Sequence, residues 1–159
     1  MPPAANPKFL RRAIALATAN VTTGKGGPFG AVIVRGGNIV GEGANFVTAS
    51  NDPTAHAEVS AIRAAASALG TFILAGCELY SSCEPCPMCL AAAYWARVDA
   101  IYYGASAADA AAVGFDDAFL YQELCKTHSE RTLPSTQLLS DEARASFDAW
   151  IASSTKVAY

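Results

Sequence analysis

The chain of 159 residues has little charge: only 16% of its residues are Asp, Glu, Lys or Arg, whereas 52% are hydrophobic. This composition excludes an intrinsically disordered chain, which would combine few apolar residues with a high net charge. The formal net charge is −3, and the 11 Lys and Arg residues are scattered rather than clustered. A nucleic-acid partner is therefore disfavoured, because proteins that bind phosphate backbones carry a basic face. We expect a small-molecule substrate.

The sequence also lacks any apolar stretch near the ~20 residues that cross a membrane, so we expect no membrane partner. A short apolar run at 13–17 follows basic residues, but this segment fits an amphipathic helix better than a signal peptide. Cysteine is scarce and odd in number, with five residues, three of which fall within seven positions. Such spacing is poor for a disulfide framework and typical of a metal site, which favours a reducing, cytoplasmic compartment.

The length corresponds to one domain, at roughly 150 residues per domain, so we predict a single domain over 1–159. Asn6 and Pro7 are typical of a helix start, because Asn caps a helix and Pro suits its first turn. The remaining pattern predicts strands at 29–35, 39–45, 79–81 and 100–103, and helices at 52–69, 85–97, 116–124 and 140–153. The middle of the chain thus has the order β-β-α-β-α-β, which implies crossovers, some parallel pairing and an α/β fold.

Two cysteines lie in the first turn of one predicted helix. Cys86 and Cys89 are three residues apart, so they share one helix face. Free N–H groups and the helix dipole stabilise negative charge there and lower the thiol pKa, which favours the thiolate that binds metal. The alternative is a pair of small buried side chains, as free cysteines often are.

The position of His56 favours a metal site over a pair of buried cysteines. The chain has two histidines, and this one opens the neighbouring predicted helix. Helices that follow parallel strands begin side by side at the ligand-binding edge of the sheet, so His56 can meet Cys86 and Cys89. One nitrogen and two sulfur donors suit Zn²⁺, and a fourth position left to water is typical of catalytic zinc. We therefore predict one zinc ion per chain. Cys83 is a weaker candidate for a fourth ligand, because Pro85 places it before the helix.

Glu58 follows His56 by two residues, so the two side chains do not share a helix face. We expect Glu58 to lie over the open coordination position instead of binding the metal. A carboxylate there can take a proton from water and pass it to the substrate. The alternative is a surface glutamate that the helix dipole stabilises in a first turn.

The combination of H-x-E at 56–58 with P-C-x-x-C at 85–89 matches the signature of the zinc nucleobase deaminases. Four longer segments resemble the bacterial guanine deaminases, a branch of the cytidine-deaminase-like superfamily: GGPFGAVIV (26–34), SNDPTAHAE (50–58), YWAR (94–97) and GFDD (114–117). The resemblance runs nearly end to end and includes the final Tyr159. It implies a three-layer α/β/α fold around a mixed sheet. It also implies hydrolysis of guanine to xanthine and ammonia, in purine catabolism or salvage.

The resemblance further implies a set of substrate contacts. Family members form homodimers that exchange C-terminal segments, here from about residue 115, so Asp117 and Tyr159 would complete the site of the neighbouring subunit. Asn45 resembles the family's base-binding amide, and Phe29 and Trp95 resemble the aromatics that line the base. A carboxylate at Asp117 only accepts hydrogen bonds, which suits the N–H donors at N1 and the 2-amino group of guanine. The alternatives are a turn or cap role for the polar residues, ordinary core for the aromatics and a frayed end for Tyr159.

Three other functions stay open. Guanosine deamination applies the same chemistry to a nucleoside, and the mouth of the pocket decides between base and nucleoside. Deamination of adenosine in tRNA requires contacts with phosphate groups, which the net negative charge of the chain disfavours. An inactive zinc-binding module that only mediates interactions would not need Glu58, so the presence of this residue favours an enzyme.

Overall fold

The computed structural model describes residues 4–115 and 117–159. Its contacts divide the chain into two compact units, the first ending at Leu120 and the second running from Tyr121 to Tyr159. The single domain inferred from length stays a prediction. Asp116, with which a late helix was predicted to begin, lies outside the described residues.

The elements follow the predicted order. The helices of the first unit are α1 (Pro7–Thr22), α2 (Val47–Ser50), α3 (Ala57–Leu69), α4 (Pro87–Ala96) and α5 (Ala107–Ala112). Its strands are β1 (Gly30–Arg35), β2 (Asn38–Ala44), β3 (Cys77–Cys83) and β4 (Ala100–Ala105). Helix α6 (Asp117–Cys125) crosses the boundary, and the second unit continues with η1 (His128–Glu130) and α7 (Ser140–Ala152). The sequence pattern does not predict the short elements α2, α5 and η1. No helix of the described chain is both long and apolar enough to span a membrane.

The strands form one mixed sheet in the order β2-β1-β3-β4. Strand β1 pairs antiparallel with β2 and β3, whereas β3 and β4 pair in parallel, as the crossover pattern predicts. Gly36 and Gly37 join β1 to β2 with φ values of 55° and 78°. Positive φ at both central residues is what a two-residue hairpin turn requires, and glycine adopts it without steric cost.

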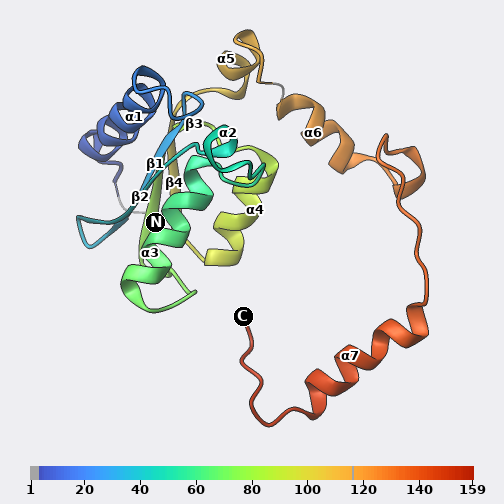
Figure 1. The fold of residues 1–159 in the computed structure, drawn as a ribbon. Coiled ribbons are helices and arrows are strands. Elements are labelled where there is room, and N and C mark those ends of the chain that lie inside the picture. The colour runs from blue at the N-terminus through green and yellow to red at the C-terminus, as the bar shows by residue number, and fades with distance from the viewer. Residues whose placement is uncertain (1–3, 116) are drawn as a thin grey trace. The chain divides into compact units, whose positions relative to one another are not determined.

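Helices cover both faces of this sheet, with α1 on one side and α3 and α4 on the other (Figure 1). Successive side chains of β1 point to opposite faces of the sheet and pack into two separate hydrophobic cores. Ala31 and Ile33 pack with the small apolar residues of α3 and α4, whereas Val32 and Val34 pack with Phe9 of α1 and with a buried tyrosine of β3. The predicted three-layer α/β/α architecture is therefore confirmed.

Asn6-Pro7 and Asp52-Pro53 both place a capping residue before a proline, and the pattern predicts a helix start at each. The first of these two starts is right and the second is wrong. Asn6 caps α1 through its side chain, which accepts a hydrogen bond from the backbone N–H of Lys8. Asp52 does not cap α3, because its Oδ1 accepts from the backbone N–H and the hydroxyl of Thr54 and closes a local turn. Helix α3 begins only at Ala57, with His56 at the N-cap. The cap-and-proline pattern thus marks a turn that leads into the helix.

Two glycines of β2 let α3 approach the sheet closely. A Cβ added to Gly41 would lie 2.5 Å from the carbonyl oxygen of Ala61 and 2.6 Å from the backbone nitrogen of Ala65. A Cβ added to Gly43 would lie 2.2 Å from the carbonyl oxygen of Ala57. Because these contacts are with backbone, the helix would have to move as a whole to accept a larger residue.

The second unit leaves apolar side chains exposed. Among the residues of α7 that the structure describes, none is buried. Phe147 and Ile151 are 66% and 67% exposed, and Trp150 is 45% exposed. Large exposed apolar side chains gathered on one element are typical of an interaction surface.

We predict that Gly41→Ala lowers the free energy of unfolding by about 1–3 kcal/mol, because the added methyl group forces α3 away from the sheet. Urea unfolding measures this change. Glu42→Ala is the matched control, since the neighbouring side chain forms an exposed ion pair with Arg12 at 2.7 Å, and such pairs contribute under about 1 kcal/mol. Equal destabilisation by the two substitutions would contradict the close-approach argument.

Candidate metal centre and active site

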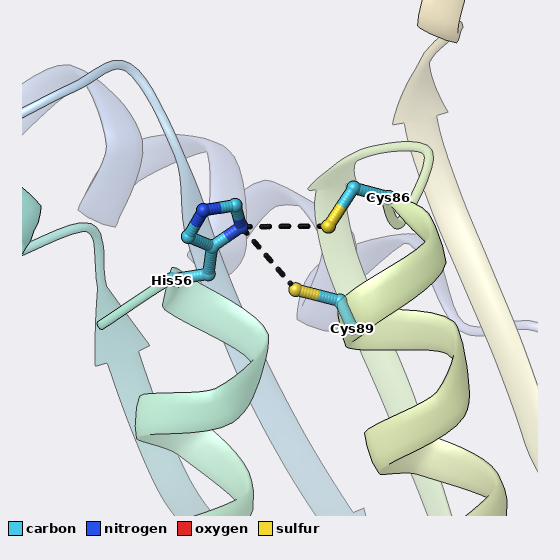
Figure 2. A group of neighbouring side chains, drawn as sticks. All are labelled: His56, Cys86 and Cys89. Carbon is cyan, nitrogen blue, oxygen red and sulfur yellow. Dashed lines mark hydrogen bonds between the residues drawn. The ribbon is translucent and has the colours of Figure 1, made fainter. Parts of the chain in front are cut away.

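The three predicted metal ligands come together at the start of two neighbouring helices (Figure 2). His56 is the N-cap of α3, Cys86 is the N-cap of α4, and Cys89 lies in the first turn of α4. Nδ1 of His56 is 3.5 Å from Sγ of Cys86 and 3.5 Å from Sγ of Cys89. Helix α4 begins at Pro87 instead of Pro85, so the cysteines stand at the cap and the first turn.

This donor set fits a zinc ion. The three ligand atoms lie within 4.8 Å of one another, which leaves room for one ion bound to a nitrogen and two sulfurs. Zn²⁺ takes such donors in a tetrahedral arrangement, and three protein ligands leave a fourth position for water or substrate. Cys83 is outside this group, and its Sγ lies 3.6 Å from the carbonyl oxygen of Ser106, to which it donates.

The pKa values of the two cysteines move in opposite directions. A hydrogen bond from Cys89, together with one from His56, lowers the pKa of Cys86 to about 4. The same bond to Cys86, with burial, raises the pKa of Cys89. The hydrogen bond to the Cys86 sulfur raises the pKa of His56 above its ordinary value. Without a metal, therefore, Cys86 is a thiolate at neutral pH and Cys89 holds its proton.

Glu58 lies beside this group, in the first turn of α3, and is 6% exposed. One carboxyl oxygen accepts a hydrogen bond from the Ser81 hydroxyl at 3.1 Å, and the other lies 3.4 Å from Sγ of Cys89. Burial raises the pKa of Glu58. A carboxylate with a raised pKa accepts a proton more readily than an exposed carboxylate, which suits an acid/base group.

A cavity of about 350 Å³ opens at the metal-ligand group. Its lining comprises Gly27, Phe29, Asn45, Val47, Thr48, His56, Glu84, Cys86, Phe115 and Asp117. Three of the predicted substrate contacts are therefore brought together with two of the predicted ligands.

Asn45 also has a structural part in this cavity. Its Oδ1 accepts a hydrogen bond from the backbone N–H of Val47 at 3.3 Å, which leaves the side-chain NH₂ group as a donor toward a ligand. Its carbonyl oxygen accepts from Nδ2 of buried Asn20 at 2.7 Å, and the same amide donates to the carbonyl of Gly27 at 2.9 Å. Asn20 thus fixes two segments of the cavity wall, a role that the sequence analysis missed.

The two other predicted contacts are Trp95 and Tyr159. Trp95 lies near the end of α4, is 61% exposed, and has the guanidinium of Arg97 6.0 Å from its ring. Within the described residues it does not contribute to the cavity lining. Tyr159 belongs to the second unit and is 74% exposed. Their roles in substrate binding stay predictions.

The structure also adds cavity residues that the sequence analysis did not single out. Phe115 packs edge-on against Phe29, with ring centroids 4.8 Å apart and an interplanar angle of 83°. Glu84 accepts a hydrogen bond from the backbone N–H of Ala107 at 2.9 Å. Phe115 stands inside the GFDD segment and Glu84 directly precedes P-C-x-x-C, but spacing alone does not distinguish a wall residue from its neighbours.

Residues 4–105 match the family model described as the cytidine and deoxycytidylate deaminase zinc-binding region. The chain belongs to this deaminase family. It is 57% identical over 142 residues to the guanine deaminase of Bacillus subtilis, covering 89% of this chain and 91% of that protein. The X-ray structure of that Bacillus subtilis enzyme superposes with a TM-score of 0.94 over 98% of this chain and 99% of that chain, at 53% identity.

Two more distant relatives place the deaminase in its wider family. The structure of guanine deaminase from Nitrosomonas europaea matches with a TM-score of 0.68 and 33% identity, over 72% of this chain and 66% of that one. A tRNA-specific adenosine deaminase of Agrobacterium fabrum is 43% identical over 98 residues, covering 62% of this chain and 64% of that protein. The predicted family membership and cytidine-deaminase-like fold are confirmed.

We predict that zinc uptake by the metal-free deaminase releases protons near neutral pH, because Cys89 must lose its proton to bind. Uptake weakens as the pH falls through the raised pKa of His56, since the protonated ring cannot bind metal. Isothermal titration calorimetry in two buffers with different ionisation enthalpies measures the proton count.

The same substitution at neighbouring cysteines provides the control. Cys89→Ser removes a ligand and lowers zinc content, whereas Cys83→Ser leaves zinc bound. Loss of zinc from Cys83→Ser together with its retention by Cys89→Ser would show that the ligand assignment is wrong.

Proposed function

We propose that this protein is a zinc-dependent aminohydrolase that converts guanine to xanthine and ammonia, in purine catabolism or salvage. The observation that carries the proposal is the buried Glu58 carboxyl group beside the group formed by His56, Cys86 and Cys89. The identity to the Bacillus subtilis guanine deaminase over 89% of the chain supports guanine as the substrate.

His56, Cys86 and Cys89 would hold a zinc ion, which would lower the pKa of water and so supply a nucleophile for attack at C2 of guanine. Glu58 moves the protons. Its carboxylate takes one proton from the attacking water and delivers it to the ring nitrogen beside C2. It then takes the second proton of that water and delivers it to the leaving amine. Burial raises the pKa of the carboxyl group, so its carboxylate accepts a proton more readily than an exposed one does.

The residues that line the cavity recognise the guanine base. Asp117 accepts hydrogen bonds from N1–H and the 2-amino group, and the NH₂ group of Asn45 donates to acceptors on the purine. Phe29 and Phe115 present apolar rings to the base. A cavity of about 350 Å³ lies near the lower end of the range for ligand pockets, which favours a free base over a nucleoside.

We also propose a homodimer in which the segment from about residue 115 is exchanged and Tyr159 closes the partner's pocket. The exposed apolar side chains Phe147, Trp150 and Ile151 support an assembly that covers them. The free thiols of the proposed metal site, Cys86 and Cys89, support a reducing compartment, the cytoplasm.

The test of the proposed activity is ammonia release from guanine, guanosine, cytosine, cytidine, adenine and tRNA. We predict turnover of guanine, and we predict that Glu58→Gln keeps its zinc and its fold while guanine turnover falls by at least ~10²–10⁴-fold. A positioned acid/base contributes this much, and here one residue moves several protons.

Zinc content and thermal unfolding of the Glu58→Gln variant are the controls, because they show whether the variant has lost its metal or its fold. Near-normal guanine turnover by the zinc-loaded variant would contradict the role of Glu58. Faster turnover of guanosine, adenine or tRNA than of guanine would contradict the proposed substrate, whatever the variant does.

We predict that deletion of residues 156–159 leaves zinc content and melting temperature unchanged but lowers guanine turnover by at least about tenfold, about 1.4 kcal/mol in the barrier. The shortened tail no longer closes the guanine pocket, and smaller substrates lose less. Steady-state kinetics measure this difference.

Tyr159→Ala in the full-length chain tests the effect of the aromatic ring without shortening the tail. Val157→Ala, at another exposed position of the tail, is the control. If the shortened protein retains its guanine kinetics, Tyr159 has no part in the pocket.

A further inference from the structure

Two consecutive serines of β3 face opposite sides of the sheet. Ser81 is 1% exposed and directs its hydroxyl toward Glu58, on the side covered by α3 and α4. Ser82 is 9% exposed, and its hydroxyl accepts a hydrogen bond from the backbone N–H of Gly30 at 3.0 Å. Ser82 also lines the groove beside α1. The strand therefore carries one hydroxyl toward the active site and one toward the opposite face.

The Ser81 hydroxyl holds one end of the Glu58 carboxyl group. Its Oγ donates to Oε1 at 3.1 Å, while Oε2 lies 3.4 Å from Sγ of Cys89. Cys89 is one of the three residues whose donor atoms form the metal-ligand group, whereas Ser81 is not. The Ser81 hydroxyl is therefore the contact that can hold the carboxyl group independently of metal binding.

We propose that Ser81 is a positioning residue for Glu58: its hydroxyl fixes the carboxyl group so that Oε2 faces the metal-ligand group and the substrate. This inference rests on the proposed deamination. The glutamate side chain has three rotatable bonds between the backbone and its carboxyl group, and one fixed oxygen restricts where the other points. A shift of about 1 Å in a reacting group can cost about 10²-fold in rate, so a single buried hydroxyl can matter to turnover.

The decisive comparison is Ser81→Ala against Ser82→Ala in the zinc-loaded, full-length protein. Each substitution removes one buried hydroxyl from the same strand. We expect Ser81→Ala to lower kcat for guanine by about 10- to 100-fold, with KM changed by less than about threefold and zinc content unchanged. We expect Ser82→Ala to lower the melting temperature, because the N–H of Gly30 loses its acceptor, and to leave kcat within about twofold.

The conservative variant Ser81→Thr keeps the hydroxyl and is expected to restore most of kcat. The proposal is overturned if zinc-loaded Ser81→Ala keeps the kcat of the parent protein. It is also overturned if kcat falls only in proportion to lost zinc or lost folded protein, since a merely structural serine would act in that way.

Crystal structures give a readout that does not depend on turnover. In zinc-loaded Ser81→Ala we expect the Glu58 carboxyl group to leave the orientation that it has in the parent protein, and an unchanged orientation would contradict the proposal. A parent protein that does not deaminate guanine would refute the proposed function, and the Glu58 orientation would still decide the role of Ser81.

Discussion

The active site depends on the side-by-side placement of two helix N-termini. His56 caps α3, Cys86 caps α4, and the first turn of α4 adds Cys89, so the donor atoms meet only if the two helices begin at the same edge of the sheet. The crossover from β3 to β4 through α4 sets one of these positions, and the packing of α3 on β2 sets the other. Helix starts also supply free N–H groups that stabilise thiolates. Placement and electrostatics thus come from the same feature of the fold.

Small residues make this placement rigid. The contact face of α3 consists of alanines, and β2 meets it with glycines at positions 41 and 43. A helix and a strand that touch through backbone have little freedom to shift, because no flexible side chain lies between them. The position of His56 at the start of α3 is therefore fixed by contacts along the whole helix. The high alanine content of the chain, which carries no chemistry of its own, serves the geometry of the site.

Burial gives neighbouring acidic groups different properties. Cys86 receives hydrogen bonds and has a pKa of about 4, whereas Cys89 and Glu58 have raised pKa values. In the metal-free group, negative charge is therefore favoured on the Cys86 sulfur, whereas Cys89 and Glu58 bind a proton more tightly than exposed groups of their kind. Binding of a divalent cation reverses the balance, because it favours the thiolate at both sulfurs. The donor atoms thus lie together in the metal-free protein, and metal binding releases a proton from the site.

The sequence pattern predicts the four strands and the longer helices but not the short elements α2, α5 and η1. The compound motif identifies the candidate metal ligands and Glu58, and the three-layer fold follows from the family resemblance. Periodicity and turn residues encode local structure, and a compound motif such as H-x-E with P-C-x-x-C is too specific to arise often by chance. Helix boundaries were less certain: Asp52 closes a turn instead of capping α3, because the nearest hydrogen-bond donors belong to Thr54.

The packing of the elements, in contrast, determines which side chains line the cavity and which hold the lining residues in place. Asn20 lies 25 positions from Asn45 and Ser81 lies 23 positions from Glu58, yet each pair is joined by a buried hydrogen bond. Nothing local marks Asn20 or Ser81, because their partners are brought to them by the packing of α1 and α3 on the sheet. Long-range hydrogen bonds of this kind depend on the register and spacing of whole elements, which spacing along the chain does not encode.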